Sequence, residues 1–371
     1  MARGRRDGIL IAGGGMAGCL AALAMARTRP EVPLLIVEER ETFGGEGHRL
    51  FAQDELGPEG TALIDPIAPA LWPGFYLAFP DLARKMKGAW GDLDAQSLHR
   101  AMVATLAHGQ YRLGTKVVAV RDDALVLDGG ETVKAEGAID ARGAANLSAL
   151  ELLYEARLER DYRFGAPHGV DRPVLIDATV DQGAGLRYFE CVPLSEDRMA
   201  IADICISERS QGDEQAGARI DAYVKARPWS RPETLAERAA ARPLPFGGDF
   251  SAFWRLGGAR VAKIGLRGGF IHPVTGRAVG DAARTALLLA RHQSFAGPAL
   301  QDAFEVEAKQ LWKKREPARS IVRAIGDAPA EARPALAKRL YGLDGALLDR
   351  LFADRPGLLD RGRLQRALRG T

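Results

Sequence analysis

The feature that most constrains the fold is residues 8–26, an apolar stretch that carries glycines in the spacing GxGxxG. Gly13, Gly15 and Gly18 come directly after the apolar residues 9–11, and an Ala- and Leu-rich segment follows them. In a strand, tight turn and helix of this kind, the first glycine permits the turn, the second admits a pyrophosphate and the third lets the helix pack close to the strand. The stretch therefore predicts a dinucleotide-binding unit whose phosphates lie at the helix N-terminus.

The residues that follow favour this interpretation over two others. A second apolar strand, residues 34–37, ends in Glu38, twenty residues after Gly18, which suits a carboxylate that accepts hydrogen bonds from ribose hydroxyls. Residues 8–26 are also long and uncharged enough to count as a transmembrane candidate. With three arginines before them and Ala-Met-Ala at their end, they imitate a signal peptide as well. The clustered glycines and Glu38 favour the nucleotide-binding fold.

Composition narrows the class of protein further. With 371 residues the chain is long enough for two domains, and its net charge of +3 points to no particular partner. The three cysteines, Cys19, Cys191 and Cys205, form no CxxC pair and no metal-ligand spacing, so we expect a reducing compartment and no metal site. No basic patch is interleaved with aromatic residues, which argues against a nucleic-acid partner.

A glycine doublet indicates which dinucleotide is bound. Gly44 and Gly45 lie about six residues beyond Glu38, and this position resembles the flavoprotein version of the fold, which makes FAD the first choice of ligand. The last of several short strands predicted over residues 110–140 leads into the sequence DARG, where Gly143 would allow a close backbone approach to the adenosine side of FAD. Plain turns are the alternative interpretation of both glycine positions.

Residues 61–80 are apolar and aromatic but contain four prolines, so they cannot form one helix. Their aromatic residues, Trp72, Phe75, Tyr76 and Phe79, suit either a cavity for a long hydrocarbon or an ordinary domain junction. Apolar spacing and turn residues predict helices over 94–109, 218–226 and 278–292, and a hairpin turn at Asp128-Gly129-Gly130.

Blocks of sequence spread over residues 8–290 resemble one family. They are GGGMAGCLAALAMA at the glycine turn, Glu38 with Gly44-Gly45, IDARG (139–143), PHGVDRPVLIDATVDQ (167–182), RYFECVPLSEDRMAIAD (187–203), GGDFSAFW (247–254) and GLRGGFIHPVTGR (265–277). Together they resemble the bacterial type of lycopene β-cyclase, and the blocks at 167–182 and 265–277 are distinctive of it.

The resemblance implies an α/β fold, in which a mostly antiparallel β-sheet substrate domain is inserted into an FAD-binding, Rossmann-like three-layer domain, with a helical C-terminus. The expected FAD-binding domain comprises residues 1–85, 110–150 and 255–300; the substrate-binding domain comprises 86–109 and 151–254; and the helical C-terminal region comprises 301–371. The resemblance also implies a carotenoid tunnel, reduced FAD and NAD(P)H as the electron source.

The same resemblance assigns residues to the cofactor. The expected FAD-binding residues are Gly13, Gly15, Met16, Gly18, Glu38, Gly44, Gly45, Arg142, Gly143, His272 and Gly276. Of these, His272 is expected to be a packing or flavin-side residue rather than a base. The helix at 278–292 would begin beside the flavin, where its N-terminus favours negative charge on the reduced ring. The segment after the glycine doublet and one later position differ from the family. Residues 46–49 (Glu-Gly-His-Arg) replace a His-Thr-Trp-like segment, and Arg277 replaces a tyrosine. Both changes place charge near the expected flavin or tunnel mouth.

The implied reaction closes a β-ring on a lycopene-like carotenoid. An acid protonates the terminal double bond, the neighbouring double bond attacks the cation, and loss of a proton completes the ring. The family carries its acid in the pattern aliphatic-Glu-Asp-Thr, which matches residues 201–204 here, so that Ala202 stands at the glutamate position. A methyl group cannot donate a proton. Asp203 is retained, but the alternation of a strand points it to the opposite face.

Glu190 is the predicted replacement for the missing acid. Residues 187–193 and 198–204 are predicted strands, and symmetric pairing about the turn between them sets Glu190 opposite Ala202. Opposite side chains of an antiparallel pair lie on one face, within about 5 Å of each other. We therefore predict Glu190 and Asp203 as the catalytic residues, with an exposed strand position as the alternative for Glu190.

Three functions remain open at this point: a carotenoid cyclase, another FAD-dependent oxidoreductase acting on an apolar polyene, and a catalytically inactive paralogue that binds FAD or carotenoid. Residues 313–371 hold fourteen Lys or Arg against seven Asp or Glu, and basic residues surround the apolar spacing from Leu359 to Leu368. This pattern is typical of a solvated helix or of one that lies on a membrane surface. Because a long hydrocarbon must be drawn from a bilayer, we expect a cytoplasmic protein attached peripherally to the inner face of the cell membrane.

Overall fold

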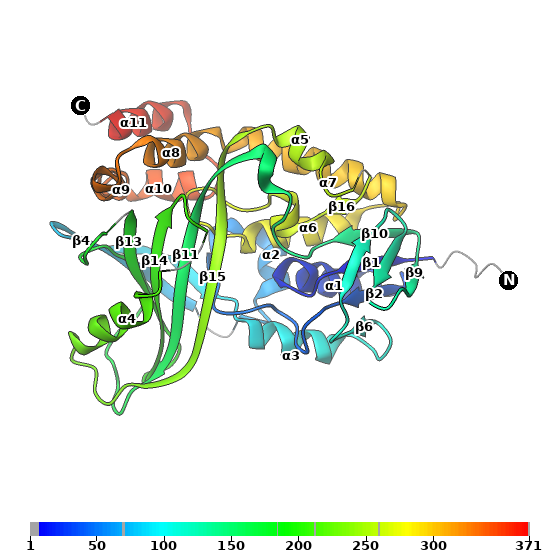
Figure 1. Cartoon of the computed structure of the whole chain (residues 1–371), viewed down its shortest axis with the longest axis horizontal. Helices are drawn as coiled ribbons and strands as arrows, with labels where there is room; N and C mark the ends of the chain where they lie inside the picture. The colour runs from blue at the N-terminus through cyan, green and yellow to red at the C-terminus, as the bar shows by residue number, and fades with distance from the viewer. Residues whose placement is uncertain (1–6, 69–70, 184, 211–212, 259, 370–371) are drawn as a thin grey trace.

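The computed structural model describes residues 7–68, 71–183, 185–210, 213–258 and 260–369. Two sheets lie beside each other, and the last helices of the chain cover the larger one (Figure 1). The shorter helices that connect these layers are α2 (Gly57–Ile64), α5 (Phe250–Arg255) and the 3-10 turns η1 (Gln53–Glu55), η2 (Leu147–Ala149), η3 (Gly265–Gly268) and η4 (Ala330–Ala332).

The first sheet has five parallel strands in the order β16-β10-β1-β2-β6. These are β1 (Ile9–Ala12), β2 (Leu34–Val37), β6 (Tyr111–Arg112), β10 (Gly137–Asp140) and β16 (Ala262–Lys263). One face packs against α1 (Met16–Thr28), α3 (Ala95–Thr105), α6 (Val279–Arg291) and α7 (Gly297–Lys314), and the other against the antiparallel strands β7 (Val117–Val120), β8 (Ala124–Leu127) and β9 (Thr132–Lys134). The predicted Rossmann-like three-layer domain is confirmed.

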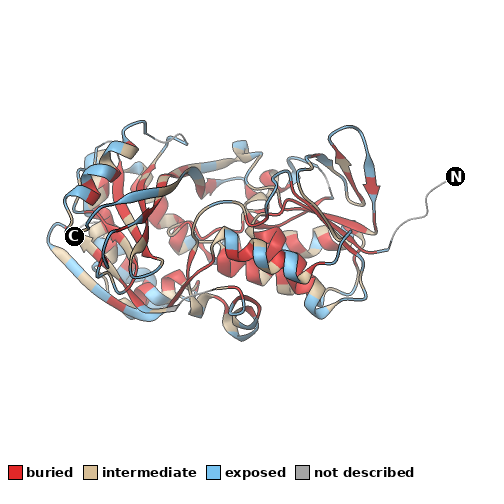
Figure 2. Cartoon of the chain, turned by 90° about the horizontal axis from the view of Figure 1, so that it is seen from below, coloured by how far each residue is buried: buried red, intermediate tan, exposed pale blue. Residues whose placement is uncertain are grey.

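Helix α1 explains why residues 8–26 imitate a membrane span. Nine of its 13 residues are buried, because it lies between the parallel sheet and the helices α3 and α6. Buried residues fill this layer and the strands beside it, and a second buried region lies in the other half of the molecule (Figure 2). A helix that is apolar on all sides belongs to a core when its neighbours cover it. Within the described parts of the chain, the structure contains no helix that combines the length and apolar character needed to cross a membrane.

The second sheet has eight strands in the order β15-β11-β14-β13-β12-β4-β5-β3. They are β3 (Leu50–Ala52), β4 (Leu71–Phe79), β5 (Leu82–Asp92), β11 (Leu150–Arg163), β12 (Val174–Asp177), β13 (Leu186–Pro193), β14 (Arg198–Ser207) and β15 (Glu233–Gly248). All neighbours pair antiparallel except β4 and β12, which are parallel. The predicted mostly antiparallel sheet is therefore confirmed.

Helices cover both faces of the second sheet. On one face lie α8 (Glu316–Asp327), α9 (Arg333–Tyr341), α10 (Gly345–Phe352) and α11 (Leu358–Arg369), and on the other lies α4 (Ala216–Lys225) (Figure 1). Ile321, Leu340 and Leu348 from the C-terminal helices share one apolar cluster with Phe75 and Ala202 from the sheet. This packing positions a wall of helices opposite β13 and β14.

The predicted helices and turn agree with the structure, whereas two of the predicted domain boundaries do not. The helices expected at 94–109, 218–226 and 278–292 are observed as α3, α4 and α6, and Gly129-Gly130 lies in the turn between β8 and β9. The boundaries, however, differ from the structure. Residues 71–85 are expected in the FAD-binding domain, but they lie in β4 and β5, because β4 pairs with β12 in the second sheet. Conversely, α3 packs on α1 through Leu98 and Met102, so it belongs to the first domain rather than the second.

The aromatic stretch at 61–80 is likewise divided between elements. Helix α2 ends at Ile64 and β4 begins at Leu71, with residues 69–70 outside the described residues. Along β4, Phe75 faces the C-terminal helices, whereas Tyr76 faces the opposite side of the sheet. The stretch thus contributes Phe75 to the cavity on the helix-covered face and Tyr76 to the opposite face of the second sheet.

Candidate active site

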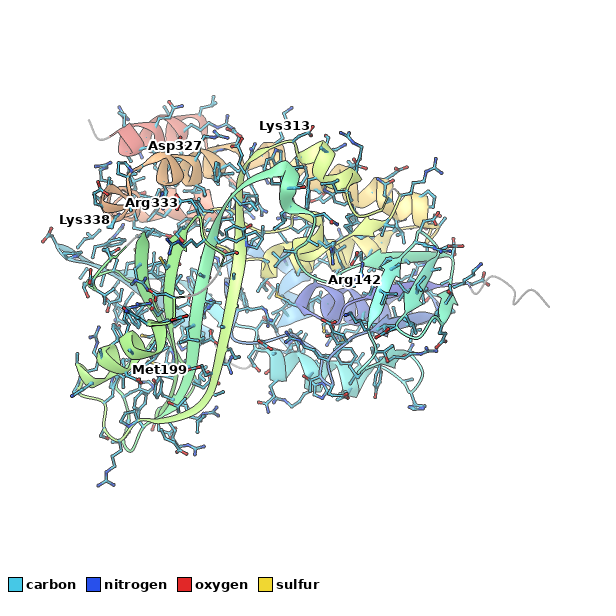
Figure 3. All side chains as sticks on the ribbon, in the orientation of Figure 1. Arg142, Met199, Lys313, Asp327, Arg333 and Lys338 are labelled. Carbon is cyan, nitrogen blue, oxygen red and sulfur yellow. The ribbon has the colours of Figure 1, made fainter. Side chains whose placement is uncertain are left out.

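A continuous cavity of about 570 Å³ joins the glycine turn of the first sheet to the helix-covered face of the second. Its lining at the first sheet includes Gly13, Gly15, Met16, Glu38, Arg142 and Gly143, and its lining at the second includes Phe75, Trp90, Tyr188, Glu190, Leu340 and Phe352. Arg142 lies at the edge of the parallel sheet that faces the second sheet (Figure 3). One cavity therefore has a polar, glycine-lined end and an apolar end.

The glycine turn has the geometry that a bound pyrophosphate requires. Gly13 has a φ of 101°, which favours glycine, and a Cβ on Gly18 would lie 2.0 Å from the Gly13 carbonyl oxygen. A Cβ on Gly15 would meet nothing within 4 Å, so this residue opens onto the cavity. Helix α1 begins at Met16 without a capping side chain, which leaves first-turn N–H groups for a phosphate.

Glu38 and the glycine doublet shape the same end of the cavity. The Glu38 carboxylate accepts hydrogen bonds from the backbone N–H groups of Gly14 (2.5 Å) and Arg40 (3.1 Å). The backbone N–H of Gly44 donates to the Gly14 carbonyl at 2.8 Å, which holds the loop against the glycine turn. Gly45 lines the cavity. The loop after β2 is thus attached to the phosphate turn.

The other predicted cofactor residues divide into two groups. Arg142, held by two bonds to Asp140 (2.9 and 2.8 Å), lines the cavity together with Gly143 and Gly276. His272 does not line it: the ring lies buried behind the turn, with Nε2 3.7 Å from Asp354. Burial lowers the pKa of His272 to about 4, so the ring is neutral at pH 7. His272 was expected among the FAD-binding residues, but the structure buries it outside the cavity lining.

The two predicted catalytic carboxylates lie on opposite faces of the second sheet. Glu190 on β13 pairs with Ala202 on β14, which is the predicted register, and Glu190 lines the cavity. Asp203 is buried on the other face, where Arg187 (2.9 Å) and Arg219 (2.7 Å) bind its carboxylate. The structure therefore does not bring Asp203 to the cavity or to Glu190.

A set of charged residues beside Glu190 is absent from the sequence predictions. Arg157 on β11 donates from Nη2 to Glu190 (2.8 Å) and to Glu159 (2.8 Å), and its Nη1 lies 3.6 Å from Glu155. The signal was available, because charged residues alternate at 155, 157, 159 and 161 and alternate residues of a strand share a face. Arg157 is thus shared by three carboxylates.

The pKa values of Glu190 and Glu159 are shifted in opposite directions. Glu155 and Glu159 each have a second cation, Arg242 at 3.3 Å and Arg238 at 2.8 Å, whereas Glu190 pairs only with Arg157 among the described residues. Burial raises the pKa of Glu190 above its usual value, against the attraction of Arg157. Burial would also raise the pKa of Glu159, but Arg157 and His48 hold it below its usual value. Glu190 is therefore the better proton carrier of these two glutamates.

His48, on the loop that follows the glycine doublet, contacts two further carboxylates beside this cluster. Its Nδ1 lies 2.5 Å from Asp92 and its Nε2 lies 3.4 Å from Asp161. His48, Glu159 and Asp161 are close enough to share a metal ion, but the guanidinium of Arg238 already contacts both carboxylates (2.8 and 2.5 Å). We therefore assign no metal here.

This arrangement predicts a pH-dependent stability. Burial alone would lower the pKa of His48, but Asp161 and Asp92 raise it from 6.5 to about 10. Because the folded pKa is the higher one, the contribution is complete below pH 6.5 and is lost as the pH rises through about 10. We expect the free energy of unfolding to fall by up to about 1.4 kcal/mol per pH unit in this window, measured by urea denaturation. The variant His48→Asn should lack this slope, and equal slopes in both proteins would contradict the prediction.

The apolar end of the cavity also contains a charge. Arg277 binds Glu55 at 2.6 Å, and its Cζ lies 4.8 Å from the centre of the Trp90 ring and 5.4 Å from that of Phe352. Burial raises the pKa of Glu55 despite this pair. The aromatic faces at this point already hold a cation.

Known proteins share both the sequence pattern and the fold. A family model described as "Lycopene cyclase protein" matches residues 8–366. Similar proteins are the lycopene beta-cyclases of Pseudescherichia vulneris (30% identical over 361 residues, 97% of this chain and 93% of the relative) and Pantoea ananas (29% over 358 residues, 96% and 93%). Two solved structures have a similar fold. One is a geranylgeranyl bacteriochlorophyll reductase-like protein from Thermoplasma acidophilum, with a TM-score of 0.62 and 13% identity, covering 98% of this chain and 96% of that one. The other is a flavin-dependent halogenase from Xanthomonas campestris, with a TM-score of 0.62 and 14% identity, covering 99% of this chain and 94% of that one.

Proposed function

The chain belongs to the lycopene cyclase protein family, and we propose that it is an FAD-dependent enzyme that closes β-rings at the ends of a lycopene-like carotenoid. One observation carries this proposal: a single cavity joins the glycine turn to an apolar chamber and has the Glu190 carboxyl on its wall. An apolar chamber suits a hydrocarbon, and a buried carboxyl suits the protonation of an alkene, which is a weak base.

The residues at the polar end fit FAD. Gly15 and Met16 would receive the pyrophosphate, Glu38 would accept from the ribose, and Arg142, Gly143 and Gly276 would line the groove. Reduced FAD, when bound, supplies an electron-rich group beside the cation that ring closure requires, and NAD(P)H is the proposed source of its electrons. This assignment rests on the open space at Gly15 and the uncapped N-terminus of α1.

Glu190 is the proposed acid. Its carboxyl gives a proton to the terminal double bond, the adjacent double bond forms the new carbon–carbon bond, and a ring carbon then loses a proton. One proton is gained and one is lost, so the product is an isomer of the substrate and no net oxidation occurs. Arg157, at 2.8 Å, stabilises the carboxylate that Glu190 leaves after donation. The C-terminal helices exclude water that would otherwise capture the cation.

A second candidate function has a specific observation in its favour. Arg277 already occupies the faces of Trp90 and Phe352, which a carbocation would otherwise use. An FAD-dependent oxidoreductase acting on an apolar polyene needs no such cation site. An inactive paralogue that binds FAD or carotenoid is the third candidate, because Ala202 removes the family's acid.

Expression in a lycopene-accumulating bacterial host tests these functions together, with the carotenoids separated by chromatography. A cyclic product is the expected result. A changed but acyclic product would replace the proposal with the oxidoreductase, and unaltered lycopene would replace it with the inactive paralogue.

We also propose that α11 attaches the protein to the membrane surface from which it draws its substrate. Leu358 and Leu359 are 84% and 83% exposed, and Arg361, Arg363 and Arg366 follow on the same helix. Exposed leucines insert into a bilayer interface while arginines bind anionic headgroups.

We expect Leu358→Ser/Leu359→Ser to lower the fraction that sediments with anionic vesicles by at least about fivefold, since each leucine contributes about 1.5 kcal/mol or more when buried. Equal sedimentation of variant and parent would contradict attachment through α11, and Val306→Ser, another exposed apolar residue, is the matched control.

A further inference from the structure

Two tyrosine hydroxyls in the cavity lining have no partner in the described parts of the chain. Tyr188 on β13 and Tyr341 at the end of α9 both line the cavity. No described residue forms a hydrogen bond with either hydroxyl, yet neither oxygen is among the fully buried polar atoms that lack a partner. Both oxygens therefore keep accessible surface on residues that line the cavity. By contrast, the hydroxyl of Tyr223, on the opposite face of the second sheet, donates to Asp177 at 2.7 Å.

The two tyrosines belong to the apolar end of the cavity. Tyr188 and Glu190 are two residues apart on β13, so they project from the same face of the second sheet. The ring of Tyr341 lies between two others, with its centroid 6.1 Å from that of Phe79 and 6.0 Å from that of Phe352. Both tyrosines pack in the apolar cluster that the second sheet shares with the C-terminal helices. The glycine turn that would receive FAD lies at the other end.

Both hydroxyls stay protonated at pH 7 and can donate. Burial raises the pKa of Tyr188 well above its usual value, and the neighbouring Glu155, Tyr341 and Glu190 add to this effect. Burial also raises the pKa of Tyr341 to about 12, although the charge of Arg277 acts in the other direction. A hydroxyl removed from water without an acceptor is unfavourable. A substrate made only of carbon and hydrogen has no acceptor, so it would leave both donors unpaired.

We propose that the polyene bound in this cavity carries an oxygen atom, as an alcohol or a carbonyl, on the end group that enters the apolar end, and that this oxygen accepts hydrogen bonds from Tyr188 and Tyr341. This inference rests on the proposed function and narrows its substrate to an oxygen-bearing polyene. A site built to hydrogen-bond a polar group rejects the analogue that lacks it, because its own polar groups are then left unpaired.

The test measures how the protein distinguishes two acyclic terpenoid probes, the alcohol farnesol and the hydrocarbon farnesene. Equilibrium dialysis against protein with excess FAD gives both dissociation constants, with the probes quantified by gas chromatography. In Tyr188→Phe/Tyr341→Phe, farnesol should bind at least about tenfold more weakly, because its hydrogen bonds are lost, while farnesene binds as it does to the parent. The free energy of unfolding should keep the parent value, since neither hydroxyl has a protein partner; hydroxyls with a merely structural role would lower it.

A matched control and three contrary outcomes make the test decisive. Tyr162→Phe, on the opposite face of the second sheet, should change neither dissociation constant. Parent-like farnesol binding by the double variant would overturn the inference and leave the hydroxyls to water. If that variant instead loses affinity for FAD, measured by flavin fluorescence, while farnesol binding is unchanged, the hydroxyls serve the flavin and the inference is also wrong. If the parent binds neither probe, the apolar chamber of the proposed function fails, and the inference fails with it.

Discussion

Replacing Glu190 with glutamine is expected to lower the rate of ring closure at least a hundredfold, because a positioned general acid contributes about 10²–10⁴. Glutamine has nearly the same shape, and its amide oxygen can still accept from Arg157, so the variant removes the proton and little else. The measurement is conversion of lycopene to cyclic products by purified protein with reduced FAD. Glu196→Gln, in the exposed turn of the same hairpin, is the matched control and should retain full activity.

The register of β13 and β14 supplies a stricter test of the same residue. Glu190 and Ala202 are directly opposite each other, so a carboxyl at either position reaches the same part of the cavity within about 5 Å. We expect Ala202→Glu to restore ring closure to the inactive Glu190→Gln variant. If Glu190→Gln leaves turnover unchanged in a parent that cyclises lycopene, the acid lies elsewhere and the assignment must be withdrawn.

Replacing Gly15 with alanine is expected to weaken FAD binding about ten- to hundredfold without unfolding the protein. The added methyl group meets nothing within 4 Å in the protein, so it projects into the space that the pyrophosphate would occupy. Forcing one extra methyl into a close contact costs about 1–3 kcal/mol, which corresponds to this loss of affinity. Flavin fluorescence gives the affinity, and thermal unfolding of the protein without flavin gives the stability.

Two other glycines make this prediction specific. In Gly18→Ala the new Cβ would lie 2.0 Å from the Gly13 carbonyl oxygen, so both stability and FAD binding should fall. Gly362→Ala on α11 also meets nothing within 4 Å; it should leave FAD binding unchanged and should not lower stability, because alanine favours a helix over glycine. Wild-type affinity in Gly15→Ala would show that the glycine turn does not carry the phosphates.

The parts of the structure that were predictable are those set by local sequence. The turn at Gly13 and the register that pairs Glu190 with Ala202 follow from backbone requirements within a few residues. The prediction places residues 71–85 of the β4–β5 hairpin in the FAD-binding domain, which is wrong. The hairpin joins the second sheet through parallel pairing of β4 with β12, about a hundred residues away. No local signal specifies such a pairing.

The charged cluster of the candidate site was missed for a related reason. The alternation of charge along β11 is visible in the sequence, but solvated strands show the same pattern. The loop that carries Gly47 and His48 lies against Glu159 and Asp161, and this packing helps to turn that pattern into a buried ion cluster.

The cavity has two walls that come from separate layers of the molecule. Glu190 is fixed in a sheet, where hydrogen-bonded neighbours on both sides hold its position, whereas Leu340 and Phe352 belong to helices α9 and α10. Side chains on those helices can change in size without disturbing the strand register that positions Glu190. Substitutions on α9 and α10 can therefore reshape the apolar end of the cavity while the Glu190 carboxyl stays in place.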